Sequence, residues 1–366
     1  MNKQRQTSNG VGNIYFTVGP TQTHPKLGEY LNEGLEKGIY SISHRGKQFG
    51  ELFTHTVSSL KTLLNIPPDF HVFFIGSATE GMELILENCA EDKSFHFVNG
   101  AFSKRFFRTA QELGKHPERL EVPAGEGFDM QKALIPKDTE LVCITVNETS
   151  TGVSVNMPDI RALKLKHPGT LFAADIVSSV PYALVDWDAV DCAFFSVQKG
   201  FGMPSGLGVL IVNGACIGKS EQLKARGVNI GSFHNFSALL KYAGKQQTPE
   251  TPNVMAIYVL GRVCDDYIEK GLASIQKETD EKARLLYAFL DASVRYPAFV
   301  KKEAWRSKTV IVAETPEGSA TVLKRLSERG YIVGAGYGEF KDTHIRIGNF
   351  PMHKVEDVKK ILKVLE

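Results

Sequence analysis

The 366-residue sequence lacks an excess of charge of either sign, because 43 lysines and arginines balance 41 acidic residues. The formal net charge of +2 leaves no field strong enough to indicate nucleic-acid binding. The chain also lacks an apolar run long enough for a membrane helix, and its polar start has no signal-peptide pattern. These absences predict a cytoplasmic protein that binds neither nucleic acid nor membranes.

Cysteine is scarce as well, and the five residues are Cys89, Cys143, Cys192, Cys216 and Cys264. Their odd number, wide spacing and mostly apolar neighbours predict buried free thiols in a reducing compartment rather than disulfides. No CxxC pair or Cys/His cluster indicates zinc, so we expect no metal site.

What the chain does have is enough apolar sequence for a large core. Hydrophobic residues make up 42% and charged residues 23%, the usual balance for a globular protein. A chain of this length favours one large domain and one smaller domain. We predict an N-terminal arm over residues 1–15, a large domain over 16–261 and a small C-terminal domain over 262–366.

The first of these domains alternates short apolar runs with amphipathic stretches. Each run is rich in Val, Ile or Phe and is bounded by Gly, Asn, Ser or Asp, as strands are. The runs are His71–Gly76, Phe95–Gly100, Leu141–Asn147, Leu171–Val177, Cys192–Gln198 and Val209–Asn213. Strands that are apolar on both faces predict an α/β fold with a mostly parallel sheet covered by helices.

The last hundred residues have a different texture, typical of a small α+β domain. We expect, in order, helix Ile275–Val294, strand Thr309–Ala313, helix Ser319–Arg329, strands Tyr331–Gly334 and His344–Ile347, and helix Lys354–Leu365.

Lys199 follows an apolar run and enters a glycine-rich turn, Gly200–Gly202. A lysine at a strand end beside a cleft can be partly desolvated, which favours the neutral amine that Schiff-base chemistry needs. An ordinary surface lysine at a turn is the alternative, and Lys199 taken alone does not exclude it.

Asp175 ends another apolar run, Leu171–Ala174. A carboxylate at the end of a buried strand needs a cationic partner or several hydrogen bonds. The protonated ring nitrogen of pyridoxal phosphate is such a partner. A structural Asp that caps the next turn is the alternative, but Asp175 and Lys199 together favour the cofactor.

A third feature suits an anion. The run Phe73–Ile75 leads through Gly76–Thr79 into an amphipathic helix, so backbone N–H groups and the positive end of a helix dipole meet there. An ordinary helix cap at Ser77 or Thr79 would look the same.

These features belong to an ordered set of motifs that resembles the phosphoserine aminotransferases. This family lies in the class V branch of the fold-type I pyridoxal-phosphate enzymes. The motifs are Gly19-Pro20, Ser43-His44-Arg45, Gly76-Ser77-Ala78, Gly100-Ala101-Phe102-Ser103, Asn147-Glu148-Thr149, Asp175, Gln198-Lys199-Gly200 and Thr251-Pro252. The resemblance runs from about Tyr15 to the end of the chain.

The resemblance implies a role for each matching residue around the cofactor. Lys199 would carry pyridoxal phosphate as a Schiff base and then act as general acid and base. Asp175 would pair with the pyridine nitrogen, Phe102 would stack on the ring, and Thr149 would donate to the phenolic oxygen. The cofactor phosphate would be held by Ser77, Ala78, Gln198 and, from a second subunit, Thr251. Thr248 in the near-duplicate Thr248-Pro249 competes with Thr251 for that role.

The same resemblance implies a homodimer with shared active sites. His44 and Arg45 of the partner chain would bind the distal phosphate or carboxylate of the substrate, since a guanidinium recognises such oxyanions in a bidentate way. Arg346 would bind the α-carboxylate. An exposed arginine on an edge strand is the alternative for Arg346.

Three positions depart from the family pattern. Phe102 stands where tryptophan is common, so the ring can still stack but the indole N–H is lost. The His-Arg pair that usually precedes the C-terminal arginine is missing, and Gly338-Glu339-Phe340-Lys341 occupies that region. Glu339 would repel a phosphate if it faced the pocket. The C-terminal motif Ile345–Asn349 is closer to the general class V form.

The predicted reaction is transamination of O-phosphoserine with 2-oxoglutarate in serine biosynthesis. The serious alternative is another class V aminotransferase acting on serine or alanine with glyoxylate or pyruvate. Nucleotide binding is disfavoured, because Asn213 stands where a Walker A loop over Asn213–Ser220 needs its first glycine. A cysteine desulfurase is disfavoured too, since no cysteine lies in an obvious mobile polar loop.

Overall fold

The computed structural model describes residues 12–366, and its larger sheet has seven strands in the order β2-β10-β9-β8-β5-β3-β4. These strands are β2 (His71–Ile75), β3 (Ser94–Val98), β4 (Glu118–Glu121), β5 (Leu141–Thr145), β8 (Leu171–Asp175), β9 (Cys192–Ser196) and β10 (Gly208–Val212). All six predicted strands are confirmed to within two residues at each end. The polar edge strand β4 was not predicted, because its sequence, Glu-Arg-Leu-Glu, has no apolar run.

Strand direction agrees with a mostly parallel sheet, with one exception. The pairs β3–β4, β3–β5, β5–β8 and β8–β9 are parallel, whereas β10 is antiparallel to both β2 and β9. Residues 197–207 join β9 to β10 without a helix, and a parallel crossover normally needs one. β2 therefore runs in the same direction as β9, and the carboxyl ends of six strands share one edge.

Alternate residues of each central strand enter two separate apolar cores. In β9 Phe195 packs into one core and Phe194 into the other, and in β10 Val209 and Leu210 divide in the same way. Burying each such side chain contributes about 1.5–3 kcal/mol. The first core takes α1 (Leu27–Glu36), α2 (Lys47–Leu63), α5 (Met157–Lys166) and α8 (Val254–Lys270); the second takes α3 (Ala78–Cys89), α4 (Ala101–Glu112), α6 (Gly214–Ala225) and α7 (Phe236–Ala243).

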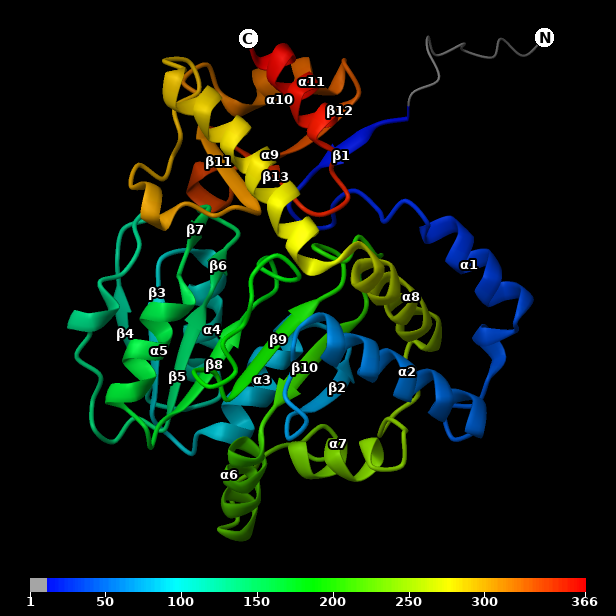
Figure 1. Cartoon of the computed structure of the whole chain (residues 1–366). Helices are drawn as coiled ribbons and strands as arrows, with labels where there is room; N and C mark the ends of the chain where they lie inside the picture. The colour runs from blue at the N-terminus through cyan, green and yellow to red at the C-terminus, as the bar shows by residue number, and fades with distance from the viewer. Residues whose placement is uncertain (1–11) are drawn as a thin grey trace.

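A second, four-stranded sheet has the order β1-β12-β13-β11 and lies above the larger sheet in Figure 1. Its elements are β1 (Ile14–Phe16), α9 (Leu272–Ala292), β11 (Val310–Glu314), α10 (Ser319–Ser327), β12 (Tyr331–Ala335), β13 (His344–Gly348) and α11 (Val355–Leu365). The predicted order of helices and strands in this region is confirmed. The short strand β1 was not predicted, and it pairs in parallel with β12. The predicted domain boundary between residues 261 and 262 falls inside α8.

Short elements complete the fold. They are the two-stranded ribbon β6 (Asn147–Glu148) and β7 (Val153–Ser154), and the 3₁₀ turns η1 (Ile39–Ser41), η2 (Met130–Lys132), η3 (Glu303–Trp305) and η4 (Gly338–Phe340). The ribbon matters for the site because it turns the chain directly after β5, at Asn147–Thr149.

All five cysteines are free and buried, as predicted. Their spacing in the sequence gave no sign that three of them meet: the sulfurs of Cys89, Cys192 and Cys216 lie within 4.8 Å of one another. They come from the end of α3, the start of β9 and α6, in the second apolar core. Within residues 12–366, no helix has both the length and the hydropathy required to cross a membrane.

Candidate active site

Four of the predicted site residues follow strands that run in the same direction. Ser77 comes after β2, Thr149 after β5, Asp175 at the end of β8 and Lys199 after β9. Their strands therefore deliver them to one edge of the sheet, below the four-stranded sheet in Figure 1. In α/β folds this edge is where ligands bind.

Lys199 is buried there, with 7% of its surface exposed. Its Nζ donates a hydrogen bond to Thr149 Oγ1 at 2.8 Å and lies 5.1 Å from the centre of the Phe102 ring. Gly19 packs against the lysine stem so closely that a Cβ at this position would lie 2.8 Å from Lys199 Cε. A side chain at residue 19 would therefore displace the lysine, and the φ of +139° at Gly19 also favours glycine.

Burial changes the acidity of Lys199. Desolvation lowers the pKa of its amine to about 8, the nearby Arg346 adds to this, and Asp175 and Glu148 oppose it. A substantial fraction of the amine is therefore neutral near pH 8. A neutral amine is the form that can attack a carbonyl carbon.

Asp175 is buried as well and has few partners. Its Oδ1 accepts a hydrogen bond from the Val177 N–H at 3.0 Å. The pKa of this carboxyl is raised to about 7, chiefly by burial and to a smaller extent by Glu148, against the opposing effects of the Val177 N–H and the charge of Lys199. The cost of desolvating the Asp175 carboxylate thus exceeds the stabilisation that its neighbours within the chain provide. A carboxylate in this condition needs a cationic ligand.

Glu148 belongs to the Asn147-Glu148-Thr149 motif, but the sequence predicted no role for it. It is fully buried. Its two oxygens accept hydrogen bonds from Phe102 N, Ser103 N, Ser103 Oγ, Ser150 N and Ser150 Oγ at 2.6–3.3 Å. Negative charge at a helix N-terminus is favourable, so Glu148 anchors the start of α4 and holds Phe102 over Lys199.

The Gly76–Thr79 turn has the predicted form of a helix start. Ser77 caps α3 by accepting from Glu80 N at 3.1 Å, and Ala78 N donates to Ser196 Oγ at 2.9 Å. Gln198 lies two residues after β9, and its Oε1 is buried without a hydrogen-bond partner in the described part of the chain. A buried amide oxygen of this kind needs a ligand or a water molecule.

Arg346 reaches the same group from the second sheet. Its strand β13 lies between β12 and β11, so the alternative of an edge-strand arginine is wrong. The guanidinium donates from Nε to Ala335 O at 2.8 Å and from Nη1 to Thr149 O at 3.4 Å. It also lies 5.3 Å from the centre of the Tyr337 ring, which in turn packs 5.5 Å from the Phe102 ring.

The remaining predicted residues form a second group. Arg45 donates from Nη1 to Gln247 Oε1 at 3.1 Å and to Thr248 O at 2.6 Å, and from Nη2 to Pro249 O at 2.8 Å. Its neighbour His44 packs edge-on against Phe49. We call residues 43–45 with residues 247–251 the distal group.

Within the distal group, Thr248 and Thr251 differ in exposure. Thr248 is buried and its Oγ1 donates to Glu250 O at 2.7 Å, whereas Thr251 is exposed. His234, which sequence reasoning missed, ties Glu250 to Glu80 of α3 and lies 3.3 Å from Glu250 Oε2. These two carboxylates raise the pKa of His234 to about 9.

The structure therefore brings Lys199, Thr149, Phe102 and Arg346 into one cluster by direct contacts, with Asp175 close enough to influence the lysine charge. It assembles the distal group separately. A sequence signal existed for Glu148, since a carboxylate after a buried strand needs donors. Gly19 belongs to the Gly19-Pro20 motif but had no predicted role, and no comparable signal marked Tyr337.

Comparison with known proteins identifies the family to which this fold belongs. The aminotransferase class-V family matches residues 17–341. A solved phosphoserine aminotransferase from Cytophaga hutchinsonii is 43% identical, with a TM-score of 0.95, over 96% of this chain and 98% of that one. Among curated relatives, phosphoserine aminotransferases from Leuconostoc mesenteroides and Rhodococcus opacus are 30% and 26% identical, over 97% and 96% of this chain and 98% and 94% of theirs.

A mostly parallel sheet with a buried lysine and a buried aspartate at its carboxyl edge is the architecture of the fold-type I transferases. The chain belongs to the aminotransferase class-V family and is a pyridoxal-phosphate-dependent transaminase. The solved structure at 43% identity and the curated relative at 30% identity, each matched over nearly the whole chain, are phosphoserine aminotransferases.

Proposed function

We propose that this chain transfers the amino group of O-phosphoserine to 2-oxoglutarate, giving 3-phosphohydroxypyruvate and glutamate, as a reversible step of serine biosynthesis. The observation that carries the transaminase chemistry is the buried Lys199 amine, whose pKa is lowered to about 8 beside a carboxylate that lacks a full set of donors. The substrate is supported by the 43% identity to the Cytophaga phosphoserine aminotransferase.

The residues at the sheet edge fit pyridoxal phosphate. The Asp175 carboxylate lacks the cationic partner that its burial requires, and a protonated pyridine nitrogen supplies one. Phe102 offers a ring face on the same side as the Lys199 amine. When bound, pyridoxal phosphate supplies an electron sink for the electrons left at the substrate Cα.

Lys199 acts twice in this proposal. Its neutral amine would hold the cofactor, and, once freed, the same amine would move the proton from the substrate Cα to C4′ of the cofactor. A pKa of about 8 suits both steps, because general acid–base catalysis is most effective when the pKa lies near the working pH. Thr149 accepts a hydrogen bond from this amine at 2.8 Å and so holds it in position. Its one hydroxyl proton goes to Ser178 Oγ, so the donation to the phenolic oxygen of the cofactor that the resemblance implies would require this hydroxyl to turn.

The turn at Ser77 and Ala78 receives the cofactor phosphate at the N-terminus of α3, where the helix dipole favours an anion. The side chain of Gln198, which follows β9 and has a buried oxygen without a partner, would complete this phosphate site. No metal ion takes part in the proposed chemistry.

Arg346 binds the substrate α-carboxylate in this proposal. Nε and Nη1 already donate to backbone carbonyls, which leaves Nη2 and the second Nη1 proton as donors for a carboxylate. His44 and Arg45 bind the distal phosphate of a substrate held by the partner chain. The three hydrogen bonds that Arg45 donates to residues 247–249 would fix the direction in which its remaining donors point.

The proposal needs a homodimer, since the distal group has no contact that joins it to Lys199 within the described residues of one chain. Mixing Lys199→Ala chains with Arg45→Ala chains tests this directly. A mixed dimer contains one site with both native residues, so activity should return. A mixture of Lys199→Ala with Asp175→Asn is the control, because each of these residues serves the site of its own chain and both sites of the mixed dimer therefore keep one defect. Recovery in neither mixture would reject shared sites.

Thr251 is the proposed contact from the partner chain to the cofactor phosphate, because it is the exposed member of the Thr248–Thr251 pair. Thr251→Val should weaken cofactor retention by roughly 10-fold, the value of one charge-assisted hydrogen bond. Thr248→Val should have little effect on it. The reverse pattern, measured by cofactor release in dilution, would move the role to Thr248.

A half-reaction screen tests the substrate. The purified enzyme, mixed with one amino acid at a time, should lose the visible absorbance of the bound cofactor rapidly with phosphoserine and with glutamate. A response to serine or alanine alone would reject phosphoserine and assign the chain to the alternative, a small-substrate aminotransferase that uses glyoxylate or pyruvate.

The distal site can be separated from the chemistry by one pair of variants. Arg45→Ala should lower kcat/KM for phosphoserine by about 10- to 100-fold, since bonds between charged groups are worth about 1.5–3 kcal/mol. It should change the rate with a neutral amino acid little. Lys47→Ala, which removes an exposed charge from the same segment, is the matched control. Equal losses for both substrates in Arg45→Ala would exclude it from the distal site.

The reducing compartment predicted from cysteine use agrees with five free thiols in the structure. We propose a cytoplasmic location on this ground.

A further inference from the structure

A hydrogen-bond network of four buried side chains lies behind the Lys199–Thr149 pair. Its members are Thr149, Ser178, Asn147 and Thr309, none more than 4% exposed. Ser178 stands in the loop after β8, and Thr309 directly precedes β11 of the second sheet. The network thus connects the edge of the large sheet to the small one.

The bonds run in one direction away from the lysine. Lys199 Nζ donates to Thr149 Oγ1 at 2.8 Å, Thr149 Oγ1 donates to Ser178 Oγ at 2.9 Å, and Ser178 Oγ donates to the carbonyl oxygen of Asn147 at 2.9 Å. A carbonyl cannot donate, so it ends the chain and sets the direction of both hydroxyl groups.

Ser178 has no spare hydrogen-bonding capacity. A hydroxyl has one proton and two acceptor positions. The proton goes to Asn147 O, and the acceptor positions are used by Thr149 Oγ1 and by Asn147 Nδ2, the latter at 2.7 Å. The Thr149 proton is therefore drawn toward Ser178, and the lone pairs of Thr149 face the amine.

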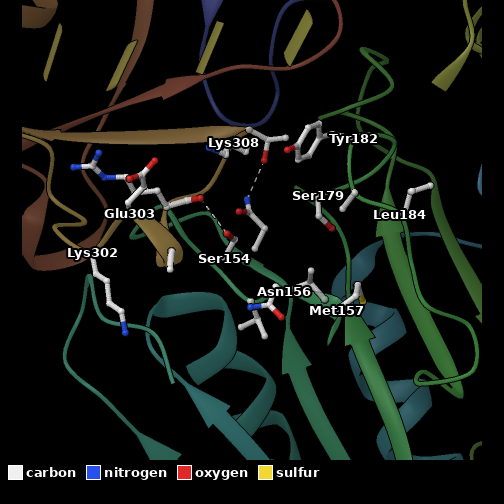
Figure 2. Close-up of a pocket in the computed structure, with 16 residues that line it drawn as sticks. Ser154, Asn156, Met157, Ser179, Tyr182, Leu184, Lys302, Glu303 and Lys308 are labelled. Carbon is white, nitrogen blue, oxygen red and sulfur yellow. Dashed lines mark hydrogen bonds between the residues drawn. The ribbon is translucent and has the colours of Figure 1, made fainter. Parts of the chain in front are cut away.

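Thr309 braces the same arrangement from the second sheet. Its Oγ1 donates to Ser178 O at 2.5 Å and accepts from Asn147 Nδ2 at 3.2 Å. Asn147 and Thr309 also line a cavity of about 840 Å³ between the large sheet and the 302–309 segment. Figure 2 shows this cavity, with Ser179 and Tyr182 on one side and Glu303 on the other.

We propose that Ser178 is a positioning residue: braced by Asn147 and Thr309, it orients the Thr149 hydroxyl so that Thr149 accepts a hydrogen bond from the Lys199 amine. This inference rests on the proposed function, in which Lys199 is the amine that carries the cofactor. It assigns to the chain a residue outside every motif recognised in the sequence.

The orientation has a consequence for the charge on Lys199. An acceptor aimed at the amine favours its protonated form, whereas a hydroxyl free to turn can donate to the neutral form. The charged groups that also face Lys199 are Asp175 on β8, Glu148 on β6 and Arg346 on β13. None of them hydrogen-bonds to Ser178, so replacing Ser178 leaves them in place.

The test is the pH dependence with which the cofactor-free full-length chain takes up pyridoxal phosphate, followed by visible absorbance. The uptake rate reports the fraction of neutral Lys199 amine. In Ser178→Ala the midpoint of this dependence should fall by about 0.5–1 pH unit, less than the full value of a bond to a charged group. Thr309→Val should lower it in the same direction by less, and Ser178→Thr should restore it.

Ser179→Ala is the matched control. Ser179 is the adjacent buried serine, and its Oγ donates to Ile176 O at 3.1 Å, outside the network. It should leave the midpoint unchanged. A double-mutant cycle separates positioning from general damage: in a Thr149→Val background, Ser178→Ala should have no further effect on the midpoint.

An unshifted midpoint in Ser178→Ala, or a shift of the same size with Thr149→Val already present, would overturn the proposal. Failure of the proposed function has a different signature. If Lys199 does not carry the cofactor, Lys199→Ala would take up pyridoxal phosphate with the absorbance change of the unaltered chain.

Discussion

Within residues 12–366, two lysines of similar acidity are buried in different regions, and only one of them lies at the edge of the large sheet. Lys199 at the edge of the large sheet is 7% exposed and Lys282 in α9 is fully buried. Burial lowers the pKa of each amine to about 8. Acidity alone therefore does not distinguish a reactive amine from a structural one.

The difference lies in what surrounds each amine. Lys282 Nζ donates to two backbone carbonyls, Phe350 O and His353 O, each at 2.8 Å. His353 in turn contacts the carbonyl of Tyr15, so this lysine helps to join α9, the 350–353 loop and the N-terminal strand. Fixed carbonyl acceptors hold an amine in place and cannot be exchanged for a substrate.

Lys199 has the opposite surroundings. It has one neutral hydroxyl partner, an aromatic ring beside it, and a nearby carboxylate that is buried without a full set of hydrogen-bond donors. Each of these groups can interact with a flat, charged ligand without breaking the fold. Neighbouring groups that lack interaction partners, more than a lowered pKa, therefore distinguish Lys199 from Lys282.

The largest effect should come from Lys199→Ala. Loss of the covalent link and of the proton-transferring amine should lower kcat by more than about 10⁴-fold, beyond the usual range of acid–base catalysis alone. The visible absorbance of the bound cofactor should disappear while the far-ultraviolet circular dichroism stays the same. Retained absorbance would place the cofactor on another amine and reverse the comparison.

Asp175→Asn should change how stability depends on pH in the cofactor-free chain. The folded-state pKa of about 7 is above the ordinary value of 3.8, so between these values the folded chain keeps a proton that the unfolded chain has lost. Stability from this group is therefore full below about pH 4 and is lost as the pH rises to about 7.

The slope should approach roughly 1.4 kcal/mol per pH unit, and Asp175→Asn should lack it. Urea unfolding of both chains at pH 5, 6, 7 and 8 measures the difference. The unaltered chain should lose stability relative to the variant up to about pH 7 and then run parallel to it. A difference that stays constant, or that changes in the opposite direction, would contradict the assigned burial cost.

Lys282→Met should have the smallest effect of the three and a different kind of effect. Two buried carbonyls lose a donor, which should lower the free energy of unfolding by about 1–3 kcal/mol. The absorbance of the bound cofactor and the kcat of the folded enzyme should stay within about two-fold, since this amine contacts the 350–353 loop and no residue at the sheet edge. A loss of activity without a loss of stability would make Lys282 part of the site.

Much of this organisation could be predicted from the sequence, because it depends on local patterns. The strands of the large sheet are continuous apolar runs, and Lys199 and Asp175 stand where such runs end. The reversed direction of β10 and the three-residue strand β1 were beyond such patterns, since both depend on pairing with distant segments.

The rest of the site could not be predicted because it depends on contacts between segments far apart in the chain. Ser178 is one serine of an ordinary Ser-Ser pair until Thr149, Asn147 and Thr309 converge on it. The cluster of Cys89, Cys192 and Cys216 exists only after folding. Lys282 lies in an amphipathic helix, where a charged residue is normally exposed to solvent.

The most direct test of the central claim is chemical trapping. Borohydride reduces the C=N bond that joins the cofactor to a lysine and leaves a stable secondary amine, which peptide mass spectrometry then locates. We expect the label on Lys199 and none on Lys282. Label on Lys282, or on any lysine other than Lys199, would place the cofactor linkage elsewhere and reject the role of Lys199.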